Sequence, residues 1–281
     1  MSAGFQKRIF TAQDGAEINY VDESPEKGDP ILFVHGWLMQ GRSFQSLAKA
    51  MSKKRRVLWI DLRGHGKTVS KGPYTMQQLA MDINELVEHL GLQQVMYVGF
   101  SMGAFVLFQY IRDFGCKNLR HAVVIDMPPK LLNDDQWKHG QYQGSYTASD
   151  MQRDLDSIEH DYPHFLADFC QQLLIRHTPD EERKHSPPVI FRMAQKVLFR
   201  NPPLAYWADM QAQDYRNDLS LFTIPLAILY AKPGSLFEEG AAEYIHACVP
   251  NSTLFPIENA THASLLYRTK ELARILDAFS I

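Results

Sequence analysis

One serine in this sequence stands in a setting that could make it a nucleophile. The segment Gly99-Phe100-Ser101-Met102-Gly103 follows an apolar run at 95–98 and leads directly into an apolar helical pattern. Small residues on both sides permit a sharp strand-to-helix turn, which holds the serine at the carboxyl edge of a sheet. The helix start also offers free N–H groups where an oxyanion would form. We interpret Ser101 as a nucleophile; the alternative is a structural turn serine.

A serine hydroxyl is a weak nucleophile, and it needs an adjacent base that a carboxylate orients. In a strand-turn-helix setting of this kind, the acid and then the histidine follow the serine along the chain. His262 falls between the last apolar run and the last helical pattern. From that loop its imidazole can reach over the sheet edge, so we predict that His262 is the base.

The acid has more than one candidate. Asp126 ends the apolar run that follows the helix after Ser101, which puts its carboxylate at the same sheet edge. Glu238 and Glu239 follow a later run that ends at Tyr230, but no acidic residue stands directly after that run. We favour Asp126. Glu238 or Glu239, and a serine–histidine pair without an acid, stay open.

Short apolar runs alternate with helical patterns along most of the chain. The runs lie at 31–34, 56–60, 95–99, 122–126, 225–230 and 252–255, and the helical patterns at 41–51, 75–90, 102–114, 239–249 and 270–279. This alternation indicates parallel βαβ units, and strands without in/out alternation indicate a sheet that is covered on both faces. The sequence predicts an α/β fold with a doubly wound, mostly parallel sheet.

One long segment breaks the alternation. Residues 131–221 have helical patterning, many aromatic residues and no convincing β run. We predict a core of residues 1–130 and 222–281, with 131–221 as a helical cap inserted over one end of the sheet. The cap residues Trp137, Tyr142 and Trp207 are expected to line a mainly apolar substrate pocket.

Composition narrows the classes of partner. The 281 residues carry a formal net charge of −3, and the three cysteines form no pattern typical of a metal site. We expect no nucleic-acid partner. The start of the chain lacks the apolar segment of a signal peptide, and no run reaches 18 apolar residues. The expectation is a cytoplasmic protein without a membrane partner; a homodimer stays open.

These motifs resemble those of the α/β-hydrolase family, over almost the whole chain. His35-Gly36-Trp37 is similar to the family's oxyanion loop, and Asp61-Leu62-Arg63-Gly64-His65-Gly66 to a loop that shapes the pocket wall. The resemblance implies that the N–H groups of Trp37 and Met102 bind the oxyanion, that His35 adjoins the substrate pocket, and that no cofactor or metal is needed. An acid at Asp126 is similar to a subset of the family that includes hydrolases and cofactor-independent quinolone and quinaldine dioxygenases.

Three functions follow from this resemblance. We expect a serine hydrolase that cleaves a carboxylic ester or lactone through an acyl-enzyme on Ser101, with an apolar acyl or aromatic group in the substrate. Acyl-homoserine lactones are one such substrate class. The first alternative is a cofactor-independent dioxygenase that cleaves a 3-hydroxy-4-quinolone-type ring with His262 and Asp126 as its base. The second is a catalytically silent receptor for a small ligand.

Overall fold

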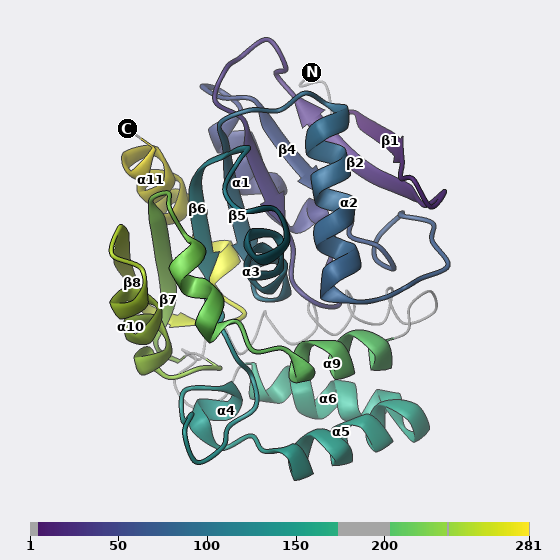
Figure 1. Cartoon of the computed structure of the whole chain (residues 1–281), viewed down its shortest axis with the longest axis vertical. Coiled ribbons are helices and arrows are strands. Elements are labelled where there is room, and N and C mark those ends of the chain that lie inside the picture. The colour runs from purple at the N-terminus through teal and green to yellow at the C-terminus, as the bar shows by residue number, and fades with distance from the viewer. Residues whose placement is uncertain (1–4, 174–202, 235, 281) are drawn as a thin grey trace.

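The computed structural model describes residues 5–173, 203–234 and 236–280. In these residues eight strands form one sheet in the order β1-β2-β4-β3-β5-β6-β7-β8 (Figure 1). The strands are β1 Lys7–Thr11, β2 Glu17–Glu23, β3 Ile31–Val34, β4 Val57–Ile60, β5 Val95–Phe100, β6 Leu119–Ile125, β7 Leu226–Gly234 and β8 Ser252–Thr261. Pairing is parallel from β4 to β8, whereas β2 is antiparallel to both β1 and β4. The predicted fold class is confirmed.

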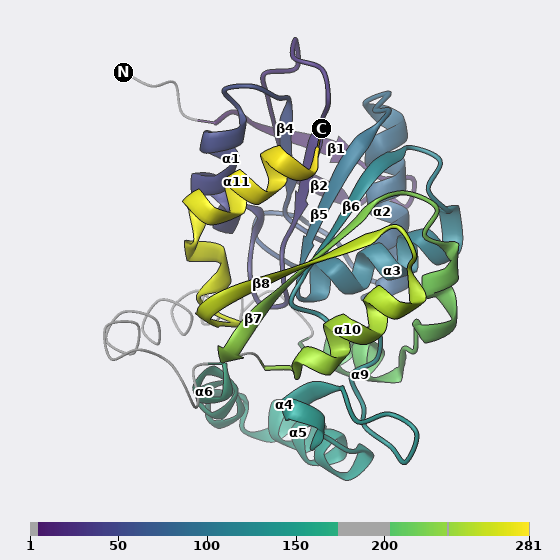
Figure 2. The same cartoon turned by 90° about the vertical axis from the view of Figure 1, so that its left-hand side faces the viewer.

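Helices cover both faces of this sheet. On one face lie α1 Gln45–Met51 and α11 Thr269–Phe279, and on the other lie α2 Met76–His89, α3 Met102–Phe114 and α10 Glu239–Cys248 (Figure 2). Successive residues of the central strands point into two different hydrophobic cores: Leu32 packs on the α2 and α3 side, and Phe33 on the α1 and α11 side. Both faces are therefore apolar, which explains why the strands show no alternation in the sequence.

The sequence missed two strands and ended two others too early. It missed β1 and β2, an antiparallel edge pair in which β1 buries only Phe10. It also ended β7 at Tyr230, whereas β7 and β8 continue as a pair to Gly234 and Thr261, past a register shift at Lys232/Pro233. The apolar runs in the sequence end close to the point where β6 stops pairing with β7. Beyond that point β7 and β8 pair only with each other.

The described part of 131–221 is helical and lies over the carboxyl edge of the sheet (Figure 1). Its elements are α4 Gln141–Gly144, α5 Ala148–His160, α6 Tyr162–Gln172, α9 Pro203–Ala212 and the 3₁₀ turn η2 Arg216–Leu221. The stretch 174–202, a third of the predicted cap, lies outside the described residues. Two hydrogen bonds fix α9 to the core: Tyr206 Oη donates to the Arg63 carbonyl (2.7 Å), and Met76 N–H donates to Asp209 (2.6 Å).

Arg63 is the centre of a buried ion pair between these layers. Its side chain is 1% exposed and donates two hydrogen bonds to Asp82 of α2, at 2.9 and 2.6 Å. It also pairs with Asp14 in the loop between β1 and β2 (2.7 Å). The Arg63 guanidinium therefore joins the edge hairpin to α2, and the Arg63 backbone carbonyl holds the cap helix α9.

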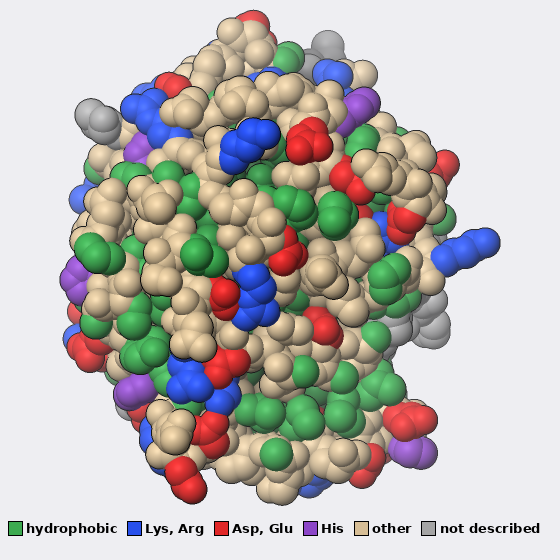
Figure 3. Space-filling model, viewed as in Figure 1, with side chains coloured by type: hydrophobic (Ala, Val, Ile, Leu, Met, Phe, Trp, Pro, Cys, Tyr) green, Lys and Arg blue, Asp and Glu red, His purple; other side chains and the backbone are tan. Residues whose placement is uncertain are grey.

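Surface features bear on the expected partners. On the face seen in Figure 3, acidic and basic side chains are interspersed, and hydrophobic side chains gather over the cap. On this face the Lys and Arg side chains form no continuous stripe of the kind that nucleic-acid binding needs. Among the described helices, none has the length and apolar character that crossing a bilayer requires.

Removal of the carboxylate from Asp82 should be costly, because it leaves a buried guanidinium without its main partner. We expect Asp82→Ala to lower the free energy of unfolding by about 3 to 5 kcal/mol in urea titrations. The control is Asp277→Ala, which breaks an exposed pair with Lys54 (side chains 70% and 35% exposed) and should cost less than about 1 kcal/mol. Equal losses in the two variants would contradict the assignment of the Arg63 cluster as a stabilising centre.

Candidate active site

The turn between β5 and α3 is as tight as the sequence predicted. Ser101 adopts φ 52° and ψ −123°, a strained conformation for a residue with a side chain. A Cβ on Gly99 would lie 2.5 Å from the Gly103 carbonyl oxygen, and a Cβ on Gly103 would lie 2.1 Å from that of Val34. Glycine is required at both positions because backbone atoms occupy the space. The packing of α3 against β3 and β5 keeps Ser101 in this conformation.

The loop after β3 runs beside the serine. A Cβ on Gly36 would lie 3.1 Å from the Ser101 Cβ, so the His35-Gly36-Trp37 segment borders the turn. Met102 is the first residue of α3, where helix N–H groups have no partner within the helix. In the described part of the chain, neither the Trp37 nor the Met102 N–H donates to a protein acceptor. Both N–H groups are therefore available to an oxyanion.

Two buried histidines hold this loop. His35 Nε2 accepts the Leu62 N–H (3.0 Å), so its proton sits on Nδ1 and is donated to the Gly36 carbonyl (2.8 Å). His65 Nε2 accepts the Leu38 N–H (3.3 Å), and its Nδ1 donates to the Arg63 carbonyl (3.0 Å). Burial lowers the pKa of His35 to about 4; burial, with the neighbouring His35, lowers the pKa of His65 to about 3. Both rings are neutral at pH 7 and fix the backbone around Trp37.

His262 and Asp126 form a buried hydrogen-bonded pair. His262 Nδ1 lies 2.7 Å from Asp126 Oδ2, and the two side chains are 5% and 2% exposed. The other carboxylate oxygen, Oδ1, accepts the Ala231 N–H of β7 (3.1 Å). A carboxylate on Nδ1 selects the tautomer that leaves Nε2 free to accept a proton. This imidazole therefore has the orientation that a general base needs.

Two aromatic rings flank the imidazole. The Phe100 ring lies 4.9 Å from the His262 ring at an interplanar angle of 32°, and the Phe237 ring lies 5.7 Å away at 83°. These contacts limit rotation of the imidazole and exclude water from two of its sides.

The other acids that the sequence left open pair elsewhere. Glu238 lies 3.7 Å from His139 Nδ1, and Glu239 lies 3.0 Å from Lys232 Nζ. Both glutamates are more than a third exposed. Among the described residues, Asp126 is the carboxylate that contacts His262.

Ser101 and His262 line the same cavity, which has a volume of about 280 Å³. Most of its wall is apolar, formed by Trp37, Leu38, Met39, Phe100, Leu166, Phe169, Cys170, Leu173, Ala263, Leu266 and Tyr267. Further polar side chains come from the segment 42–46 at the start of α1. Among the described residues, no group of three or more metal-binding side chains comes together. The cavity is suited to an organic group next to a serine and a histidine, with the Arg42 side chain also in its wall.

A model of the alpha/beta hydrolase fold family matches residues 29–269. The chain belongs to the α/β-hydrolase family. The chain is 36% identical over 131 residues to the non-heme chloroperoxidase CPO-A1 of Kitasatospora aureofaciens, a match that covers 46% of this chain and 47% of that protein. The matched part thus spans about half the length of that relative.

Two further similar proteins match nearly the whole length of this chain. The pimeloyl-[acyl-carrier protein] methyl ester esterase of Vibrio cholerae is 24% identical over 265 residues, which cover 90% of this chain and 95% of that enzyme. The crystal structure of a bromoperoxidase from Bacillus anthracis superposes with a TM-score of 0.86 at 25% identity, and covers 98% of this chain and 99% of that one. The arrangement of sheet and cap is therefore shared with solved members of the family.

The four residues expected in the substrate pocket lie elsewhere in the protein. His35 is fully buried behind the loop, and Trp137 packs between His139 and Tyr244 (5.3 and 5.0 Å between ring centroids). Tyr142 lines a different cavity, within the cap. Trp207 packs against Trp37, with 4.8 Å between ring centroids and an interplanar angle of 39°. Of the described residues that line the cavity with Ser101, none is one of these four.

The sequence missed the cap residues that do line this cavity. They are Leu166, Phe169 and Cys170 from one face of α6, and Leu173 directly after the helix, and they recur at helical spacing. That spacing predicts an apolar face, but it does not say which face of which cap helix meets Ser101. The neighbours of His262, including Ala263 and Leu266, could have been found from their position beside the predicted base.

The neutral state of His35 and His65 can be tested by NMR. Because burial lowers both pKa values below the 6.5 of an unfolded histidine, we expect both rings to stay uncharged, with the proton on Nδ1, down to about pH 5. The unfolded chain binds more protons in this range, so their contribution to stability falls as the pH drops from 6.5 towards 4. Long-range ¹H–¹⁵N spectra recorded over this pH range would show the protonation state of each ring, with the urea-unfolded chain as control. Titration midpoints near pH 6.5 for His35 and His65 in the folded protein would contradict the prediction.

Proposed function

We propose that this α/β hydrolase is a serine esterase that cleaves carboxylic esters or lactones. One observation carries the proposal: Ser101, held in a strained turn, shares a cavity with His262, whose Nδ1 is bound to the buried Asp126. A serine, an oriented histidine and a carboxylate are the parts that an acyl-transfer mechanism requires. The methyl ester esterase relative from Vibrio cholerae supports ester cleavage as the reaction type.

The proposed reaction proceeds in two halves. His262 Nε2 takes the proton of Ser101 as Oγ attacks the ester carbonyl, and the resulting oxyanion accepts hydrogen bonds from the Trp37 and Met102 N–H groups. The tetrahedral intermediate collapses, the C–O bond to the alcohol breaks, and His262 returns the proton to the leaving oxygen. Water, activated by the same imidazole, then attacks the acyl-enzyme and releases the acid and Ser101.

The cavity supports a substrate with a small apolar acyl or aromatic group. A volume of about 280 Å³ with mainly apolar walls favours the burial of hydrocarbon and offers few polar partners. A lactone is a cyclic ester, and the same steps would open its ring to the hydroxy acid. Acyl-homoserine lactones fall in this class, with the acyl chain against the apolar wall of α6.

Loss of the serine hydroxyl should stop the reaction. We expect Ser101→Ala to lower kcat for p-nitrophenyl butyrate by at least about a thousandfold, because no other group can form the acyl-enzyme. A fluorophosphonate probe should label the unmodified protein and not the variant; a protein that resists the probe would be a receptor. Oxygen uptake with a 3-hydroxy-4-quinolone, retained in Ser101→Ala, would contradict the esterase and indicate the dioxygenase.

Loss of the charge on Asp126 should leave the serine in place but disturb the base. We expect Asp126→Asn to lower kcat by about 10⁴-fold, since the amide no longer selects the His262 tautomer that accepts a proton on Nε2. Glu238→Gln and Glu239→Gln are matched controls and should change kcat less than about twofold. Steady-state kinetics on proteins with unchanged melting temperature would make the comparison, and a larger effect at either glutamate would reassign the acid.

A further inference from the structure

A second cavity lies inside the cap, apart from the one that contains Ser101. It has a volume of about 540 Å³ and lies between α4, α5 and α6, with Leu236 from the loop after β7 at its edge. Phe169 of α6 belongs to the walls of both cavities, so a single side chain separates them at that point. Nothing in the proposed ester cleavage uses this space.

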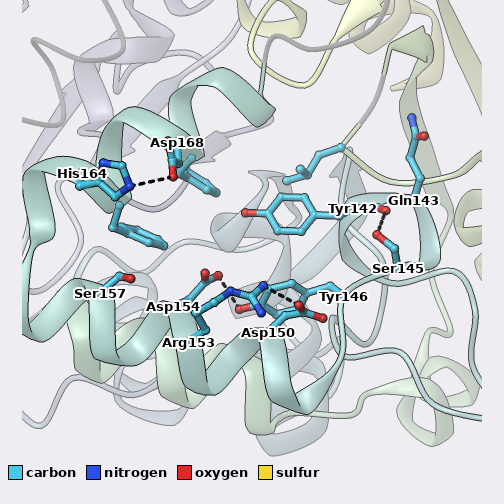
Figure 4. Close-up of a pocket in the computed structure, with 13 residues that line it drawn as sticks. Tyr142, Gln143, Ser145, Tyr146, Asp150, Arg153, Asp154, Ser157, His164 and Asp168 are labelled. Carbon is cyan, nitrogen blue, oxygen red and sulfur yellow. Dashed lines mark hydrogen bonds and ion pairs between the residues drawn. The ribbon is translucent and has the colours of Figure 1, made fainter.

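The charge of its wall is negative. The wall contains three carboxylates, Asp150, Asp154 and Asp168, and one guanidinium, that of Arg153. His164 Nε2 lies 3.4 Å from Asp168 Oδ2, so two negative charges remain when His164 is neutral and one when it is protonated. Asp150 is already engaged by Arg153 and by the capping interaction with Thr147. Asp154 on α5 and Asp168 on α6 lie on opposite sides of the space (Figure 4). Two carboxylates thus approach the same volume from two different helices.

Asp154 is held in place from behind. Trp207 Nε1 donates to Tyr146 Oη (3.1 Å), and Tyr146 Oη donates to Asp154 Oδ2 (2.7 Å). In the described part of the chain, Asp154 Oδ1 accepts no hydrogen bond. Burial, the main cause, raises the pKa of this carboxyl. A half-buried carboxylate with one free oxygen is suited to bind a cation.

The Tyr142 hydroxyl, which interacts with the Gln141 side chain, is directed into the same space. Figure 4 shows the Tyr142 hydroxyl pointing between Asp154 and Asp168, and it makes no hydrogen bond with another residue of the cavity wall. Burial, together with the negative charge of Asp154, raises the pKa of Tyr142, so the hydroxyl is neutral at pH 7. Tyr142 reaches this position from a left-handed turn, with φ 52° and ψ 46°.

Aromatic rings complete the wall. Phe165 and Phe169 stack in parallel at 5.9 Å on α6, and the Tyr142 and Tyr146 rings meet edge to face at 5.2 Å. Aromatic faces next to carboxylates attract organic cations, because the negative face of the ring adds to the charge attraction. The rings also offer apolar surface for a hydrocarbon group, which an inorganic ion lacks, and an anion would be repelled.

We propose that the cap cavity binds an organic ammonium ion. The N–H groups donate to Asp154 Oδ1, to the Asp168 oxygen that His164 does not contact, and to Tyr142 Oη. The hydrocarbon part packs on Phe165 and Phe169. The residues that form this site do not include Ser101, so the proposal is independent of the proposed ester cleavage.

Calorimetric titration with phenethylammonium tests the site, with 2-phenylethanol as the neutral probe of the same shape. We expect saturable binding of the ammonium ion and at least about tenfold weaker binding of the alcohol. Asp154→Asn should weaken ammonium binding about tenfold, because it removes the charge and keeps the acceptor for Tyr146. Tyr142→Phe, which keeps the ring, should weaken it about threefold.

The matched control is Asp156→Asn, an exposed carboxylate on the same helix that does not line the cavity. It should leave the Kd within twofold, and all variants should keep the melting temperature of the unmodified protein. The proposal is overturned if phenethylammonium does not bind, if the alcohol binds equally well, or if Asp154→Asn and Tyr142→Phe both leave the Kd unchanged. Because the titration measures no turnover, its failure leaves the proposed esterase unaffected.

Discussion

The contact between the start of α3 and the end of β3 is the constraint on which the site depends. With only hydrogen at Gly103, the helix approaches the Val34 carbonyl so closely that a methyl group would collide with it. This approach sets the Met102 N–H beside the loop that carries Trp37, and it forces Ser101 into its strained conformation. Strain of this kind persists only where surrounding packing fixes it. Here the two cores on either side of the sheet supply that packing.

The parts of the site that the sequence predicted are those tied to strand ends. Ser101, Asp126 and His262 each follow a parallel strand, and parallel strands end at a common edge, so order along the chain was enough to bring them together. Asp126 was favoured over Glu238 because it ends a strand, whereas no acidic residue directly follows the run that ends at Tyr230. The later strand continues to Gly234, but residues 235–237 after it are not acidic either, and His262 contacts Asp126.

The parts that the sequence did not predict depend on packing between helices. Trp137, Tyr142 and Trp207 are aromatic cap residues of similar type, yet one packs near α10, one faces the cap cavity and one lies behind Trp37. Helical periodicity identifies an apolar face, but the partner of that face is set by how several helices pack around each other. His35 was misplaced for a different reason: its two hydrogen bonds to backbone groups are invisible in a motif.

Trp37 belongs to two layers of the protein at once. Its backbone borders Ser101, and its indole packs against Trp207, Phe165 and Phe169 of the cap. Exchange of the cap between members of the family is therefore not a neutral way to change substrate preference. A grafted cap must bring its own aromatic surface for this indole, or the loop beside Ser101 loses the support that the present cap gives it.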